Sequence, residues 1–172
     1  MKISLTKLFA QDGKSEKYEI PLTSETFSIG GQDYRVIEKH PVILGLTHEG
    51  NRVITITGNA DLTMEIPCAR CLTPVATPFQ LEFDLQIDLN LSEEEREEKE
   101  EDSSFVEGDE LDVEELVRNE LIVQWPIRVL CKDDCKGICS RCGANLNIQT
   151  CDCDTTGLDP PNGCNQRYIQ QI

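Results

Sequence analysis

Nine cysteines in 172 residues constrain the fold of this chain more than any other feature of its sequence. No continuous apolar stretch or small-residue cleavage site follows its start, so we expect a cytoplasmic protein without a signal peptide. In a reducing compartment, clustered cysteines bind metal ions more often than they form disulfides. Eight of the nine lie in closely spaced sets, namely Cys68-x2-Cys71, Cys131-x3-Cys135, Cys139-x2-Cys142 and Cys151-x-Cys153, and Cys164 is left as a spare thiol.

The closely spaced cysteines divide into two groups of four, the ligand number of a tetrahedral structural zinc site. One predicted site consists of Cys139, Cys142, Cys151 and Cys153, and the other consists of Cys68, Cys71, Cys131 and Cys135. Four thiolates leave no open position for a catalytic water, so one or two zinc ions would serve folding and not catalysis. The tail from Cys131 onward has few large apolar side chains and needs such a crosslink, which the second site would provide across a long loop.

Two other chemistries fit the clustered cysteines less well. A reversible dithiol needs basic neighbours that lower a thiol pKa; Arg70 and Lys132 lie near the cysteines, but Asp133 and Asp134 oppose them. Iron–sulfur clusters also use four thiolates, but the spacing differs from the ferredoxin patterns.

Acidic residues are concentrated in one segment of the chain. The formal net charge is −16, and residues 82–115, with 17 acidic and two basic side chains, carry −15 of it. The centre of this segment has no hydrophobic side chain and cannot offset its ordering entropy by burial, so we expect an acidic flexible loop over residues 92–108. The acidity argues against generic attraction to nucleic acid or anionic membranes, and no apolar run approaches the roughly 18 residues that cross a bilayer.

Residues 1–91 are predicted to form an antiparallel β domain. Apolar side chains occupy alternate positions in residues 54–66 and 79–89, as in strands with one buried face. Gly58-Asn59 would turn or bulge the first of these strands. His48-Glu49-Gly50-Asn51 and Gly30-Gly31 separate further apolar runs, as hairpin turns do. Short strands joined by turns favour a curled or barrel-like sheet.

Residues 109–130 are predicted to form a helix and a connector that pack on the β domain. Asp112 and Glu115 have the spacing of a capping pair, and the apolar positions that follow have helical spacing. The helix must end near Trp125, because Pro126 disfavours the helical conformation of the residue before it. With residues 131–172 as a zinc-binding tail, the predicted class is α+β and mainly β.

Few residues suggest catalysis. His40 precedes a proline and His48 lies in a predicted turn, so we interpret both as surface or turn histidines and not as catalytic bases. The sequence has no P-loop or dinucleotide-binding glycine pattern. Its aromatic residues do not alternate with basic ones as they would on a surface that stacks single-stranded nucleic acid. We therefore predict that the protein is not an enzyme.

Three stretches of the sequence carry a family resemblance. They are Ile66-Pro67-Cys68-Ala69-Arg70-Cys71-Leu72, then Asp112, Glu120-Leu121 and Pro126 after the acidic segment, and CKDDCKGICSRCGANLN over residues 131–147. In this order they resemble the YceD family, the large ribosomal RNA subunit accumulation proteins of bacteria and plastids. The chain departs from the family at Asp159-Pro160-Pro161, where members tend to continue into an apolar helix.

The resemblance implies a non-enzymatic ribosome-biogenesis factor that supports the synthesis, processing or accumulation of large-subunit ribosomal RNA. The implied partner is a precursor of the large subunit or its assembly factors, with the RNA itself as a further candidate and no membrane. Two other classes stay open: a thiol-based redox or metal-responsive protein, and a zinc-stapled protein-interaction module without an RNA role.

Overall fold

The computed structural model describes residues 1–91, 95 and 104–153, so the centre of the predicted acidic loop and Cys164 lie outside the described residues. The elements are β1 (Lys2–Ser4), β2 (Ser15–Ile20), β3 (Thr26–Ile29), β4 (Gln32–Lys39), β5 (Val42–Gly50), β6 (Val53–Pro67), β7 (Pro74–Asp88), β8 (Val106–Glu107), β9 (Glu110–Asp112) and the helix α2 (Val113–Val123). The prediction of a mainly β fold with antiparallel sheets is confirmed.

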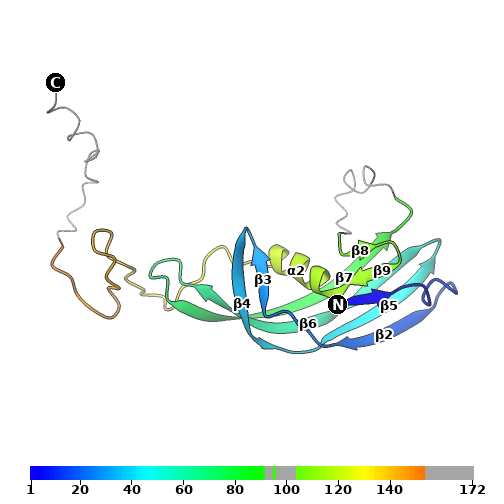
Figure 1. Ribbon diagram of the computed structural model, residues 1–172, viewed down its shortest axis with the longest axis horizontal. Coiled ribbons are helices and arrows are strands. Elements are labelled where there is room, and N and C mark those ends of the chain that lie inside the picture. Colours follow the sequence, from blue (N-terminus) through cyan, green and yellow to red (C-terminus); the bar gives the residue numbers. More distant parts are fainter. Residues whose placement is uncertain (92–94, 96–103, 154–172) are drawn as a thin grey trace, which may run out of the picture.

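Strand β6 is the centre of a six-stranded antiparallel sheet in the order β2-β5-β6-β4-β3, with β7 on the other edge of β6. It pairs with β7 along its whole length, from Val53 opposite Asp88 to Pro67 opposite Pro74. On its opposite edge it pairs first with β5 and then with β4. The sheet is curved, and the β6–β7 hairpin extends from it toward the cysteine-rich tail (Figure 1).

The alternating pattern of the two long strands is the basis of the core. In β6 the even-numbered apolar side chains are buried, and in β7 the odd-numbered ones at Phe79, Leu81, Phe83 and Ile87 are buried. Because successive side chains of a strand point to opposite faces, one face of the hairpin packs into the core and the other carries polar residues. The alternation read from the sequence is therefore confirmed.

The sequence suggested that Gly58 turns or bulges β6, but the structure shows neither. The strand passes through Gly58 and Asn59 without a register shift toward β5 or β7. The glycine is instead required by a close approach of backbones: its φ is +155°, and a Cβ atom there would lie 2.0 Å from the Ile43 carbonyl oxygen.

The turns that join the strands follow the sequence more closely. Gly30 and Gly31 connect β3 to β4 with φ of 60° and 79°, as a two-residue hairpin turn of this kind needs. The turn predicted at residues 48–51 is displaced toward β6: residues 48–50 belong to β5, and the chain turns at Asn51 and Arg52, both with positive φ.

Helix α2 packs between β3 and β7 and buries Val113, Leu116, Val117 and Leu121. The side chain of Asp112 caps it by accepting hydrogen bonds from the backbone N–H groups of Glu114 and Glu115. After the helix, the Trp125 ring stacks on Phe79 at a centroid distance of 5.7 Å. Within the described ranges, no helix is long and apolar enough to cross a membrane.

Two features of the fold were not predicted from the sequence. Strands β8 and β9 form a short hairpin that pairs with β1 in a separate three-stranded sheet. His48, interpreted above as a surface or turn histidine, is only 4% exposed in β5. Its ring packs edge-on against Phe9, and Nδ1 lies 3.1 Å from the Gln11 carbonyl oxygen. Residues of the loop after β1 therefore cover His48.

Candidate metal centres

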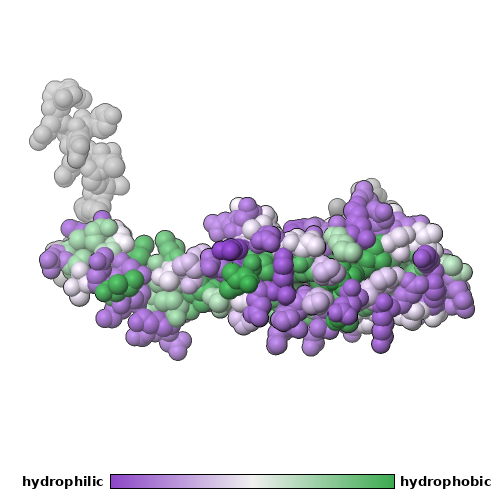
Figure 2. Space-filling view, turned by 60° about the horizontal axis from the view of Figure 1, so that its bottom comes forward, coloured by the Kyte–Doolittle hydropathy of each residue, from purple (hydrophilic) through white to green (hydrophobic). Residues whose placement is uncertain are grey.

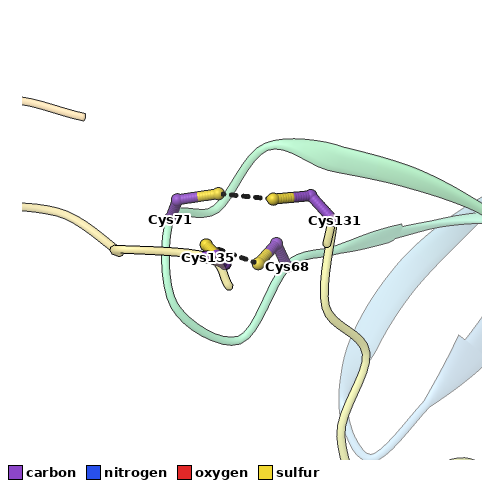
Figure 3. Close-up of side chains that lie close together, drawn as sticks. All are labelled: Cys68, Cys71, Cys131 and Cys135. Atoms are coloured by element: carbon purple, nitrogen blue, oxygen red, sulfur yellow. Dashed lines mark hydrogen bonds between the residues drawn. The ribbon is translucent and has the colours of Figure 1, made fainter. Parts of the chain in front are cut away.

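The tip of the β6–β7 hairpin holds the first pair of cysteines. Residues 68–73 leave β6 and enter β7 through a tight turn, in which the Leu72 N–H donates to the Cys68 carbonyl oxygen over 2.9 Å and the Cys68 N–H donates to the Thr73 carbonyl oxygen over 2.9 Å. Leu72 has a φ of 62°, a conformation that is strained for a non-glycine residue. This turn directs the side chains of Cys68 and Cys71 to the same side (Figure 3).

The tail is attached to this tip by backbone hydrogen bonds. The Ala69 N–H donates to the Val129 carbonyl oxygen over 2.8 Å, and the Ile138 N–H donates to the Arg70 carbonyl oxygen over 3.2 Å. The Arg70 guanidinium in turn donates to the Cys135 carbonyl oxygen over 2.8 Å. At Gly137, with a φ of +78°, a Cβ atom would lie 3.1 Å from the Arg70 carbonyl oxygen, so this close contact favours glycine.

The four sulfurs of Cys68, Cys71, Cys131 and Cys135, hereafter cluster 1, lie within 4.8 Å of one another. Cys71 Sγ is 3.5 Å from Cys131 Sγ, and Cys68 Sγ is 3.8 Å from Cys135 Sγ (Figure 3). A disulfide would place two sulfurs about 2.05 Å apart. Zinc–sulfur bonds of about 2.3 Å in a tetrahedron separate the sulfurs by about 3.8 Å, so the observed spacing suits a metal ion.

The other four sulfurs, those of Cys139, Cys142, Cys151 and Cys153, form cluster 2 and also lie within 4.8 Å of one another. The Gly143 N–H donates to the Cys139 carbonyl oxygen over 2.9 Å, and the Cys139 N–H donates to the Ala144 carbonyl oxygen over 2.8 Å. Gly143 has a φ of 73°, as expected of the tight turn after the second cysteine. The grouping of the eight cysteines is the one expected from their spacing.

Hydrogen bonds lower the pKa of two thiols of cluster 1, Cys68 and Cys71. Burial opposes ionisation of Cys68, but backbone N–H groups, that of Arg70 first among them, outweigh burial and lower its pKa to about 6. The side-chain contact with Cys71 raises the pKa of Cys131 to about 12. Four thiolates at this spacing repel one another, and a divalent cation between them would offset that repulsion.

The thiols of cluster 2 also include one with a lowered pKa and others with a raised pKa. Backbone N–H groups of Cys142 and Arg141 lower the pKa of Cys139 to about 6. The side-chain contact with Cys142 raises the pKa of Cys153 to about 12. Each cluster thus contains at least one thiol of lowered pKa and at least one of raised pKa, and a cation bound between them would favour ionisation of the latter.

Three side chains around the clusters were not identified as site residues from the sequence. Thr73 Oγ1 lies 3.2 Å from Cys71 Sγ, and Asn147 Nδ2 donates to Cys135 Sγ over 3.3 Å. Asn145 Nδ2 donates to Thr73 Oγ1 over 3.3 Å. Asn145 and Asn147 fall in the stretch that carries the family resemblance, which was the available signal, but a sequence does not show which polar side chain faces a sulfur.

Comparison with known proteins gives this chain a family. The family model "Large ribosomal RNA subunit accumulation protein YceD" matches residues 56–162. The chain is 37% identical over 54 residues to "Large ribosomal RNA subunit accumulation protein YCED homolog 1, chloroplastic" of Arabidopsis thaliana, an alignment that covers 31% of this chain and 17% of that protein. It is 26% identical over 93 residues to the uncharacterized protein Rv2926c of Mycobacterium tuberculosis, covering 54% of this chain and 45% of that protein.

These alignments span less than half the length of either curated relative. No solved structure gave a significant match. The family model, however, covers more than half of the chain and includes β7, α2 and all eight residues of the two cysteine clusters. The chain therefore belongs to the YceD family.

Proposed function

We propose that this protein is a non-enzymatic ribosome-biogenesis factor that supports the accumulation of large-subunit ribosomal RNA in the cytoplasm. The observation that carries the proposal is the family match over residues 56–162, which includes both cysteine clusters. The partner is a precursor of the large ribosomal subunit or one of its assembly factors, and large-subunit RNA is a further candidate. With a net charge of −16, the protein would bind through a limited surface and not by general attraction to RNA.

The second part of the proposal is that each cysteine cluster holds one structural zinc ion. The sulfur spacing supports it, and four cysteine ligands close the coordination shell as in structural zinc sites. In cluster 1, Cys68 and Cys71 from the sheet and Cys131 and Cys135 from the tail would share one ion. The zinc would thereby staple residues 131–172 to a barrel-like sheet formed by residues 1–91, with residues 109–130 as the packed helix and connector.

The ribosomal role is tested by sedimentation of a tagged full-length chain in lysate of the source cells. We expect the protein to sediment with precursors of the large subunit, and its depletion to lower mature large-subunit RNA relative to small-subunit RNA. Absence from every ribosomal fraction, together with an unchanged RNA ratio, would reject the proposal. A protein that sediments with a non-ribosomal complex would instead be the interaction module considered above.

The metal is tested by native mass spectrometry of freshly prepared, reduced protein, before and after treatment with a strong chelator. We expect two zinc ions per chain that the chelator removes. A metal-free chain whose thiols form reversible disulfides would support the redox alternative and reject the zinc sites. These two experiments are independent, because a ribosome-bound protein without zinc would retain the first part of the proposal and lose the second.

A further inference from the structure

The two clusters are connected by polar side chains of one loop. Residues 143–150 lie between Cys142 and Cys151, so this loop closes cluster 2. Two of its side chains, however, form hydrogen bonds at cluster 1: Asn147 with the ligand Cys135, and Asn145 with Thr73, which lies beside Cys71. The loop of one candidate metal site thus provides hydrogen bonds to the other.

Asn147 holds the cluster 1 ligand Cys135 from two sides. Its amide Nδ2 donates to Cys135 Sγ over 3.3 Å, and its Oδ1 accepts from the backbone N–H of Lys136 over 2.9 Å. The first contact stabilises a thiolate by donating a hydrogen bond to it, and the second fixes the backbone next to the ligand. Asn147 can therefore orient this sulfur toward the centre of cluster 1.

Asn145 reaches a second cluster 1 ligand, Cys71, through Thr73. Its Nδ2 donates to Thr73 Oγ1 over 3.3 Å, and this hydroxyl lies 3.2 Å from Cys71 Sγ. Its Oδ1 accepts from the backbone N–H of Asn147 over 2.9 Å. A continuous chain of hydrogen bonds therefore runs from Cys71 through Thr73, Asn145 and Asn147 to Cys135.

The same loop is tied to cluster 2 by its backbone. The Ala144 carbonyl oxygen accepts from the N–H of Cys139, a cluster 2 ligand, over 2.8 Å. The Leu146 N–H donates to the Gly137 carbonyl oxygen over 2.9 Å, and Ile138 and Asn145 form a β-bridge. Because the loop begins after Cys142 and ends at Cys151, an ion in cluster 2 would fix both of its ends.

We propose that Asn145 and Asn147 couple the two metal sites, so that an ion in either cluster strengthens binding at the other. This inference rests on the proposed zinc binding. An occupied cluster 2 restricts residues 143–150 and thereby reduces the entropy lost when the two asparagines are positioned on cluster 1. By linkage, an occupied cluster 1 favours the loop conformation that cluster 2 needs by the same factor.

The test is a set of zinc affinities measured on the full chain by competition with a coloured chelator. Cys153→Ser disables cluster 2 and reports the affinity of cluster 1 alone, and Cys71→Ser does the reverse. If the sites are coupled, the unaltered chain binds two ions more tightly than the product of the two separate affinities predicts. We expect the affinity for two ions to exceed this product by about 10-fold, within the range of roughly 5- to 150-fold that is typical of coupled sites. This factor is called the excess below.

The asparagines are tested by measuring the same set of affinities with Asn147→Ala added to each chain. We expect the excess to fall to within twofold of independent binding, and cluster 1 itself to weaken by about 10- to 100-fold, as for other partners of metal ligands. Gln149→Ala is the matched control, because Gln149 is exposed in the same loop. It should retain the excess.

Two results would overturn the proposal that the asparagines couple the sites. One is an unaltered chain whose two ions bind independently, and the other is an excess that survives in Asn147→Ala. Hydrogen exchange in β6 checks that each variant keeps the sheet; where Asn147→Ala fails this check, Thr73→Val gives the same test from the other end of the hydrogen-bond chain. A chain that binds no zinc would reject the metal sites themselves, whereas two independent ions would reject only the coupling.

Discussion

The sheet with α2, hereafter the body, differs in what it buries from the cysteine-rich tip, a name used here for residues 68–73 together with residues 130–153. The sheet and α2 bury a continuous apolar cluster that includes Leu44, Ile56 and Leu121. The tip has a separate small cluster, made of three cysteines with Val75 and Leu130 partly buried against it. Figure 2 shows the tip as a narrow extension of the larger body. Apolar burial at about 25 cal/mol per Å² can stabilise the body, whereas the tip buries little apolar surface and, on the zinc proposal, would be stabilised by metal crosslinks.

The two cysteine clusters within the tip also differ from each other, in burial and in how far apart their residues lie in the sequence. Cluster 1 joins hairpin residues to tail residues about sixty positions away, and three of its four cysteines are buried. Cluster 2 is closed within residues 139–153, and Cys139 is its one buried member. A crosslink between distant segments removes more chain entropy than a local one. With the proposed ions bound, cluster 1 would determine where the tail lies, and cluster 2 would determine its local conformation.

The largest effect is expected from Gly58→Ala, which tests the body alone. The new Cβ would lie 2.0 Å from the Ile43 carbonyl oxygen, so β5 and β6 would have to separate. We expect a loss of about 4 kcal/mol in the free energy of unfolding, measured by urea denaturation. Gly30→Ala is the control: its φ is also positive but its Cβ meets no atom within 4 Å, and about 1 kcal/mol is expected. Equal losses in the two variants would contradict this account of Gly58.

Removal of metal should affect the tip and spare the body. With a strong chelator, we expect amide hydrogen exchange to rise throughout residues 130–153, because the hydrogen bonds there are not covered by an apolar core. Exchange in β6 at Ile54 and Ile56, which are fully buried, should stay slow. If the sheet lost protection together with the tail, the body would depend on metal as well.

A smaller and more local effect should distinguish the two clusters. Cys71→Ser replaces a ligand of cluster 1 with a poor one, since the thiolate is the species that binds zinc. Exchange should rise at residues 130–135, and an ion should remain in cluster 2. In Cys153→Ser, exchange should rise at residues 143–153, while the Ala69–Val129 hydrogen bond stays protected. The reverse pattern would show that the tail is positioned by cluster 2.

The smallest effect on stability is expected from lowering the pH. Burial raises the pKa of Glu114, but hydrogen bonds from Thr23 and Ser24 outweigh it and lower the pKa from 4.5 to about 2. Because the folded-state pKa is lowered, the contribution of Glu114 to stability is present above about pH 5 and is lost as the pH falls toward 2. The Tm of Glu114→Gln should therefore depend less on pH over this range. Glu19→Gln, at an exposed position of β2, should behave as the unaltered chain does.

The regular parts of the body were predictable because their signals are local. Alternation in β6 and β7, helical spacing in α2 and the Gly30-Gly31 turn depend on a few neighbouring residues, and all are present in the structure. Gly58 and His48 were misread because their roles depend on distant partners. Ile43 approaches the first, and Phe9 covers the second. Strands β8 and β9 were missed because they are two and three residues long, and β9 pairs with β1 near the other end of the sequence.

The candidate site likewise has a part that could be predicted from the sequence and a part that could not. The grouping of cysteines was expected because spacing limits which thiols can share a centre. Thr73, Asn145 and Asn147 were missed, because their proximity to the sulfurs depends on how the tail lies against the hairpin. Ligand types are therefore visible in a sequence, whereas the residues that orient the ligands become visible only in the folded chain.

The continuous pairing of β6 with β7 also gives the protein two well-separated ends. Fifteen residues at about 3.3 Å each make the hairpin at most about 50 Å long. Asn51 lies in the turn before β6, and the exposed Leu72 lies at the opposite end of the strand. Photo-crosslinkers introduced at these two positions would sample different neighbours within one large complex. Crosslinks from both positions of a single bound copy would therefore identify the site that it occupies and its orientation there.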